Sequence, residues 1–205
     1  MQVFADKGIE GSQIDDVMKA AQVSRGGFYG HFRAMPELLT AVITELGNQI
    51  MAAIEQRVVT IADPAQRIAS GLLLYLNCVR AFPQYARFVA AAGANVVDRR
   101  SLVFIVLPPH VREGNTKGRL SVQDIGAAVD LVAGAMLAAV MRLAQGAATP
   151  AYDANIVAGI LLSLGVPRAR ARKLSELDVG QLEMAADSLL MRTHGKAISA
   201  PRRPS

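Results

Sequence analysis

The chain has 205 residues, of which 52% are hydrophobic and 5% aromatic, with no tryptophan and a formal net charge of +5 at pH 7. This length suits one large or two small domains, and the abundance of Ala and Leu favours helix over sheet. A single cysteine, Cys78, excludes an intramolecular disulfide and a cysteine-rich metal site. The first residues lack the basic and apolar pattern of a signal peptide, so we expect a cytoplasmic protein.

The chain opens with two expected helices. Residues 1–8 have the pattern of the last turns of a helix that ends at Gly8. Residues 12–21 predict a short helix, because Ser12 can cap it and Asp15 places a carboxylate in its first turn. Apolar residues recur at helical spacing along one face, and they are Ile14, Val17, Met18 and Ala21.

A second short helix is predicted over residues 25–29, after a tight turn and an N-cap at Ser24. Phe28 and Phe32 are four residues apart and face inward together. The polar residues that point elsewhere are Arg25, Tyr29 and His31. Two helices joined this way predict a helix-turn-helix, in which the second helix enters the major groove of DNA. A plain helical hairpin inside a core is the alternative, and the spacing of these polar residues favours DNA.

Two glycines in this second helix need a reason. Gly26 and Gly27 are poor helix formers, each costing ~1 kcal/mol relative to alanine. Close approach of the backbone to a phosphate or a base is one reason, and close approach to the neighbouring helix is another.

Residues 23–32, with the sequence VSRGGFYGHF, are followed by PELL at residues 36–39. This stretch closely resembles the DNA-binding domain of the TetR/AcrR family of transcriptional regulators, and the resemblance covers about residues 3–46. Members of that family are all-α, usually homodimeric and mostly repressors, which release operator DNA when a small molecule binds the C-terminal domain.

The resemblance implies a role in binding double-stranded operator DNA for each matching residue. Arg25 is expected to read a base, most readily guanine through O6 and N7. Gly26 and Gly27 are expected to lie against the DNA. Tyr29 and His31 are expected to bond phosphates, helped by the Ser24 hydroxyl or the helix N-terminus.

The chain departs from the family in two places. Family members usually have a longer first helix, so this chain begins part-way through it. A Lys commonly meets a phosphate at the position of Met35, and Arg33 is the candidate to replace it. We therefore expect a helix-turn-helix domain with an incomplete first helix at residues 1–46. A larger helical ligand-binding and dimerisation domain at residues 47–192 and a disordered tail at residues 193–205 follow.

Several helices are predicted in the larger domain from apolar periodicity and caps, including Asp63-Pro64 as a start. They cover residues 36–61, 65–82, 85–97, 121–145, 151–164 and 175–191. Residues 102–107 form a helix or part of one before Pro108-Pro109, and residues 112–119 are predicted to be a loop. The basic cluster at residues 168–173 is read as a solvated face or helix end, with non-specific DNA attraction as the alternative.

Residues 125–141 are apolar except for Asp130. This run is shorter than a bilayer span and carries a charge, so we expect no membrane insertion. In the resembling family the last two long helices form a four-helix bundle with their symmetry mates. The resemblance thus implies a homodimer through helices 121–145 and 151–164.

The material for catalysis is thin. The three histidines, His31, His110 and His194, form no pattern with metal-ligand spacing, and there is no glycine-rich phosphate loop. We expect no enzyme activity, no metal and no cofactor. The alternative function is a small-molecule-binding helical dimer that has lost DNA binding through its shortened N-terminus.

A small-molecule effector is expected inside the helical domain. Candidate lining residues, for each of which ordinary core is the alternative, are Leu72, Leu76, Val79, Phe82, Phe88 and Phe104. Few polar groups lie among them, which indicates an apolar or aromatic effector.

Overall fold

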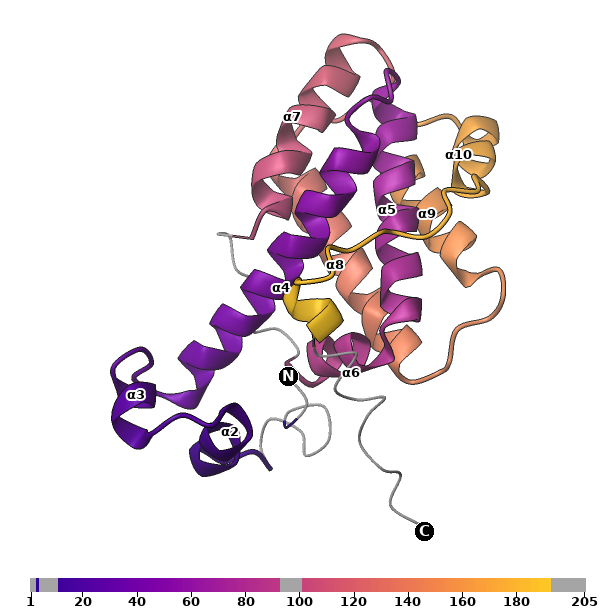
Figure 1. Ribbon diagram of the computed structural model, residues 1–205. Helices are drawn as coiled ribbons and strands as arrows, with labels where there is room; N and C mark the ends of the chain where they lie inside the picture. Colours follow the sequence, from indigo (N-terminus) through magenta and orange to yellow (C-terminus); the bar gives the residue numbers. More distant parts are fainter. Residues whose placement is uncertain (1–2, 4–10, 93–100, 193–205) are drawn as a thin grey trace.

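The computed structural model describes residue 3 and residues 11–92 and 101–192 (Figure 1). All regular structure in these residues is helical, which confirms the all-α class. Three predicted features lie outside them: the helix end at Gly8, the last part of the helix expected at 85–97, and the tail at 193–205.

The helix-turn-helix lies at the N-terminal end of one long helix. Helices α2 (Ile14–Ala21) and α3 (Arg25–Tyr29) sit beside the start of α4 (Met35–Val58), which runs from them across the rest of the molecule (Figure 1). The expected cap at Ser12 is wrong. Gln13 is the N-cap of α2, and its N–H donates to the Asp16 carboxylate at 3.2 Å. The carboxylate three residues after the cap therefore decides where α2 begins.

Helix α5 (Pro64–Ala81) is the centre of the larger domain. The Asp63 carboxylate accepts the Gln66 N–H at 3.1 Å and caps it as predicted. Five neighbours follow in the chain: α6 (Pro83–Ala92), α7 (Val103–Thr116), α8 (Ile125–Ala144), α9 (Tyr152–Ser163) and α10 (Arg168–Ser175). Each of them packs against α5, as does α4 (Figure 1).

Two groups of buried apolar side chains flank α5. One joins α5 to α7, α8, α9 and α10, with Leu76, Val157 and Leu161 at its centre. The other joins α5 to α4 and α6 and includes Leu46, Ile50 and Phe88. Cys78 lies in the second group, and burial raises the pKa of its thiol to about 12. A protonated buried thiol is a poor nucleophile, so we expect Cys78 to be unreactive.

Helix α7 corrects the sequence prediction. It runs through Pro108 and Pro109 to Thr116, so most of the segment predicted as a loop is helical. Tertiary packing overrides the rule that proline ends a helix. Leu107 and Val111 are buried on either side of the two prolines. The chain turns only after Thr116, where Gly118 adopts a left-handed φ of 62°.

The end of the chain gives a second correction. The basic cluster starts helix α10, in which Arg170 contacts the Asp63 carboxylate. The helix predicted at 175–191 is absent, because residues 177–185 have no regular structure and only 189–192 form a helical turn. We call residues 177–192 the C-terminal strap, since they cross α5 and end against α4 (Figure 1).

Side chains of α4 and α5 hold this strap through its backbone. Asn77 donates to the Gly180 carbonyl at 2.8 Å, and the Leu189 N–H donates to Gln49 at 2.8 Å. Leu182 and Leu190 are buried with the α4 residues. The apolar spacing that predicted one amphipathic helix therefore reflects burial at two separate places, Leu182 in the irregular part and Leu190 in the short helical turn.

Candidate functional site

The exposed face of α3 is built around one buried aromatic ring. Phe28 is 4% exposed and packs edge-on against Tyr29, with ring centroids 5.3 Å apart, and against Phe32 at 5.9 Å. Because Phe28 anchors the short helix, Arg25, Tyr29 and His31 remain on the surface. The structure thus brings the predicted DNA-binding side chains together on an accessible end of the molecule.

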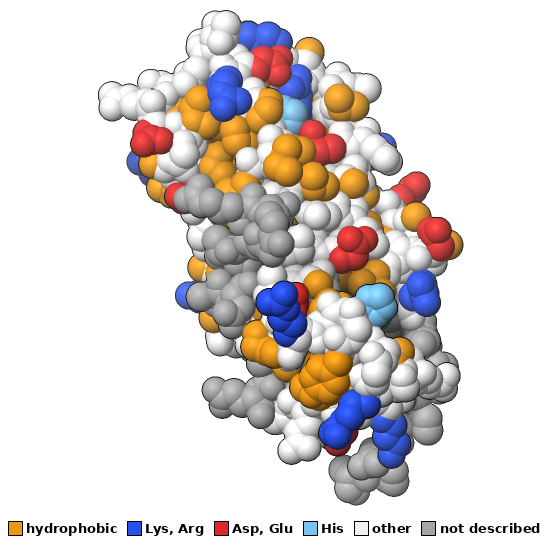
Figure 2. All heavy atoms as spheres, turned by 90° about the vertical axis from the view of Figure 1, so that its left-hand side faces the viewer, with side chains coloured by type: hydrophobic (Ala, Val, Ile, Leu, Met, Phe, Trp, Pro, Cys, Tyr) orange, Lys and Arg blue, Asp and Glu red, His pale blue; other side chains and the backbone are white. Residues whose placement is uncertain are grey.

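Arg25 is held only loosely. Its guanidinium lies 3.4 Å from the Asp15 carboxylate of α2, and the two side chains are 72% and 69% exposed. An exposed pair of this kind contributes about 0–1 kcal/mol. Arg25 can therefore leave Asp15 for another acceptor at little cost. Figure 2 shows further Lys and Arg side chains reaching the surface at this end of the molecule.

The two glycines of α3 differ in their surroundings. The Ser24 hydroxyl oxygen accepts the Gly27 N–H at 3.1 Å, and a Cβ added to Gly27 would lie 3.3 Å from that oxygen. A Cβ added to Gly26 would meet nothing within 4 Å among the described residues. Contact with a neighbouring helix among the described residues therefore does not explain Gly26.

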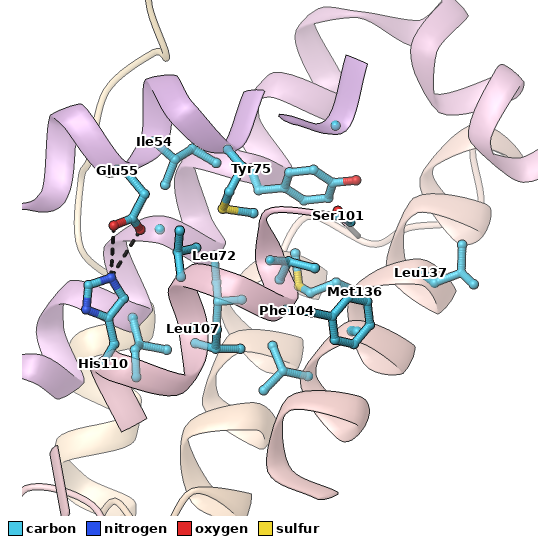
Figure 3. A pocket seen from close by; sticks show the side chains of 18 of the residues that line it. Ile54, Glu55, Leu72, Tyr75, Ser101, Phe104, Leu107, His110, Met136 and Leu137 are labelled. Carbon is cyan, nitrogen blue, oxygen red and sulfur yellow. Dashed lines mark hydrogen bonds and ion pairs between the residues drawn. The ribbon is translucent and has the colours of Figure 1, made fainter. Parts of the chain in front are cut away.

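The larger domain holds a partly open cavity of about 160 Å³ that is lined by α4, α5, α6, α7 and α8 (Figure 3). Most of its walls are aliphatic or aromatic, among them Leu72, Phe104 and Met136. Helix α4 alone contributes Ile43, Thr44, Gly47, Met51, Ile54, Glu55 and Val58. The helix that carries α2 and α3 at one end thus forms a wall of the cavity at the other.

One side of the cavity is polar. His110 Nε2 lies 3.0 Å from a Glu55 carboxylate oxygen, and His110 Nδ1 lies 3.2 Å from an Arg67 Nη1 (Figure 3). Arginine can only donate, so we assign the Nδ1 atom as acceptor and the Nε2–H as donor to Glu55. His110 thus lies within α7 and contacts side chains of α4 and α5.

Arg67 is itself already paired. It contacts Glu113 at 2.7 Å, and Lys117 contacts the other oxygen of that carboxylate at 2.6 Å. Hydrogen bonds from Lys117 and Arg67 lower the pKa of Glu113 to about 2. The charges on this side of the cavity are therefore balanced within the protein.

A second polar group lies elsewhere on the wall. The hydroxyls of Tyr75 and Tyr85, on α5 and α6, are 3.1 Å apart, and both residues line the cavity. Burial raises the pKa of Tyr75 to about 12 and that of Tyr85 well above its usual value. Both hydroxyls are consequently protonated at neutral pH.

The predicted effector-binding residues do not gather at this cavity. Leu72 and Phe104 line it. Leu76, Val79 and Phe88 are 0–1% exposed within the packed core, and Phe82 lies at the end of α5 beside the second core group. Sequence reasoning missed the polar lining residues, which come from distant parts of the chain and carry no local signal. They are Thr44, Glu55, Arg67, Tyr75, Tyr85, Ser101 and His110.

Within residues 11–92 and 101–192, no three His, Cys, Asp or Glu side chains group as a metal site would need. Helix α8 is long and apolar enough to cross a bilayer by length and composition alone, with a mean hydropathy of 1.8. Only 28% of its apolar stretch is buried in the protein, and Leu131 and Met141 are exposed on it, as is Leu162 on α9.

A helix-turn-helix joined by one continuous helix to a cavity-bearing helical domain defines a DNA-binding transcription regulator. Residues 1–42 match the bacterial regulatory proteins of the tetR family, and residues 63–176 match the tetracyclin repressor-like C-terminal domain. The chain belongs to the TetR family. Regulators of this family bind operator DNA and small molecules and form dimers. The C-terminal strap lies beyond the second match.

Solved structures share the fold. RolR without ligand is 23% identical with a TM-score of 0.74, and the match covers 89% of this chain and 95% of RolR. RolR in complex with resorcinol is 24% identical with a TM-score of 0.73, over 89% and 91% of the two chains. A protein of Shewanella sp. PV-4 assigned to the tetR family is 20% identical with a TM-score of 0.62, over 85% and 88%. The comparison with curated proteins gives no match.

Proposed function

We propose that this protein is a ligand-responsive repressor, which binds operator DNA as a homodimer and releases it when a small, mainly apolar effector enters the cavity. One observation carries the proposal: α4 lines the cavity with its second half and adjoins the helix-turn-helix with its first residues. An effector that binds one position of α4 better than another shifts the balance between DNA-binding and released states. The resorcinol complex of RolR is a precedent for a small ligand in this fold.

The DNA contacts follow from the exposed face of α3. Arg25 reads a base edge, while Tyr29 and His31 bond phosphates on either side. The Ser24 oxygen is occupied by the Gly27 N–H, but its hydroxyl hydrogen is available to a phosphate. Gly26 allows the backbone to approach the DNA. Arg33, exposed before α4, is positioned in sequence to serve the phosphate that Met35 cannot bond.

The dimer forms through α8 and α9. Leu131, Met141 and Leu162 expose large apolar side chains on these helices, and burying them between two copies removes that surface from water. In the dimer, the effector shifts the two copies of α3 away from half-sites roughly 34–36 Å apart or multiples of that spacing.

The first test is binding of the purified protein to the DNA upstream of its own coding sequence, by fluorescence anisotropy over a salt series. We expect a clear preference over unrelated DNA and a steep fall in affinity with salt, because each phosphate contact releases counterions. Equal affinity for both DNAs at every salt concentration would contradict the regulator and favour a ligand-binding dimer without DNA binding.

A pair of variants separates base reading from phosphate contact. Arg25→Ala should relax the preference by ~1–3 kcal/mol at one position of the operator. Tyr29→Phe should weaken binding to all sequences about equally. If both variants lose affinity alike on every sequence, Arg25 is not the reader.

A further inference from the structure

The size of the cavity limits what it can hold. At about 160 Å³ it is close to an engineered protein cavity of about 150 Å³ that binds benzene. Its walls are mainly aliphatic and aromatic, with Leu72, Phe104 and Leu107 facing the space (Figure 3). A molecule with a single six-membered ring therefore fills this volume, whereas a fused multi-ring molecule extends out of it through the open side.

The tyrosine pair provides a hydrogen-bond donor. When one hydroxyl donates to the other across 3.1 Å, the accepting hydroxyl keeps its own hydrogen. No second partner for Tyr75 or Tyr85 occurs among the residues that the structure describes. Both residues line the cavity, and Figure 3 shows the Tyr75 hydroxyl pointing away from the Glu55–His110 pair. The remaining hydrogen is thus available to a bound molecule. A hydroxyl hydrogen that makes no hydrogen bond in a buried site costs free energy.

The charges of the lining exclude an anion. Arg67 is the lining residue with a permanent positive charge among the described ones. Its charge is paired with the Glu113 carboxylate, and its Nε and Nη1 atoms contact the Ile61 carbonyl, His110 and Glu113. Glu55 adds a carboxylate beside it. A buried anionic group without a free cation is strongly disfavoured.

Building on the proposed function, we propose that the effector is a neutral single-ring molecule with an accepting oxygen, such as a carbonyl or hydroxyl, which is bound by the Tyr75–Tyr85 hydroxyl pair. The ring fills the apolar part of the cavity, and the oxygen accepts the hydrogen that the pair does not use. Specificity then arises from the pair, because the apolar walls accept any ring of this size.

Three probes of nearly the same shape test this chemistry by titration calorimetry on the full chain. Acetophenone has the ring and a neutral carbonyl, α-methylstyrene replaces the oxygen by a CH2 group, and benzoate carries a negative charge. A neutral hydrogen bond predicts that acetophenone binds roughly 2- to 12-fold more tightly than α-methylstyrene. Benzoate should bind more weakly than acetophenone. Equal binding of the first two, tighter binding of benzoate, or no binding of any probe overturns the proposal.

The double variant Tyr75→Phe/Tyr85→Phe locates the donor. The affinity for acetophenone should fall to the affinity for α-methylstyrene. The affinity for α-methylstyrene should stay within about 2-fold of its wild-type value, because the apolar walls are unchanged. The matched control is Tyr152→Phe, since Tyr152 lies on α9 against Arg142 and outside the cavity lining. A double variant that retains the preference for acetophenone overturns the assignment. If this variant does not fold, the probe comparison on the wild-type protein still decides.

The probe measurements use no DNA, so a result that refutes the cavity chemistry can be distinguished from one that refutes the proposed function. A preference for acetophenone with no effect of bound probe on operator affinity would refute release by an effector and leave the cavity chemistry intact. Operator binding without any probe binding would refute the cavity chemistry alone.

Discussion

Gly26 allows stability and DNA affinity to be changed in opposite directions. In Gly26→Ala the new methyl group meets no atom within 4 Å, so the helix gains up to about 1 kcal/mol from better propensity. For a chain of this length that corresponds to a melting temperature higher by about 2–4 °C. The same methyl group points outward on α3, where it would hold the helix away from the DNA. If it lengthens a base contact worth ~1–3 kcal/mol, operator affinity falls about 10-fold.

Thermal unfolding by circular dichroism and fluorescence anisotropy on the operator measure the two effects. Gly47→Ala is the matched control, because Gly47 also has nothing within 4 Å of an added Cβ but lies in α4, away from α3. Gly47 lines the cavity, so the two variants are compared in the absence of any ligand. Without ligand, this control should gain stability and keep its operator affinity. A Gly26→Ala protein that binds the operator as tightly as wild type would refute the reasoning that DNA approach explains this glycine.

Three further predictions rest on single side chains. Asp15→Asn should tighten operator binding about 2- to 5-fold in anisotropy at low salt, because it frees Arg25 and removes a charge that repels phosphates; unchanged affinity would contradict this. The pKa of Glu113 is lowered from 4.5 to about 2 in the folded protein, so its contribution to stability is present above about pH 4.5 and is lost as pH falls toward 2. Glu113→Gln should therefore flatten the fall in urea-unfolding midpoint over this range, and an unchanged slope would argue against it. Leu190→Ala should lower the unfolding free energy by ~2–5 kcal/mol, because Leu190 is buried. Met191→Ala, at a half-exposed neighbour, should lower it by ~0.5 kcal/mol or less, and equal losses would mean that burial of Leu190 does not anchor the strap.

Local rules predicted much of the helical layout. The helix expected at 36–61 is observed as Met35–Val58, and the one expected at 121–145 as Ile125–Ala144. Caps and apolar periodicity are properties of neighbouring residues, so a single sequence contains them. The face of α3 follows for the same reason, because Arg25 and Tyr29 lie within one turn of Phe28.

Features that depend on distant contacts could not be predicted in this way. The prolines of α7 are accepted because residues on both sides of them are buried against other helices. The strap has the apolar spacing of a helix, yet only residues 189–192 are helical, and its backbone bonds Asn77 of α5 and Gln49 of α4. His110 meets Glu55 across 55 positions of sequence, and neither residue has a neighbour that signals the contact.

The buried state of Cys78 has a practical consequence. It is the only cysteine of the chain, it is 2% exposed, and its raised pKa keeps the thiol protonated. A thiol introduced at an exposed position of α2, as in Ala20→Cys, would react with a maleimide or spin label while the native cysteine stays silent. The unaltered chain is therefore a ready background for spectroscopic labelling. In the proposed dimer, pulsed electron resonance then measures the distance between the labels on the two copies of α2.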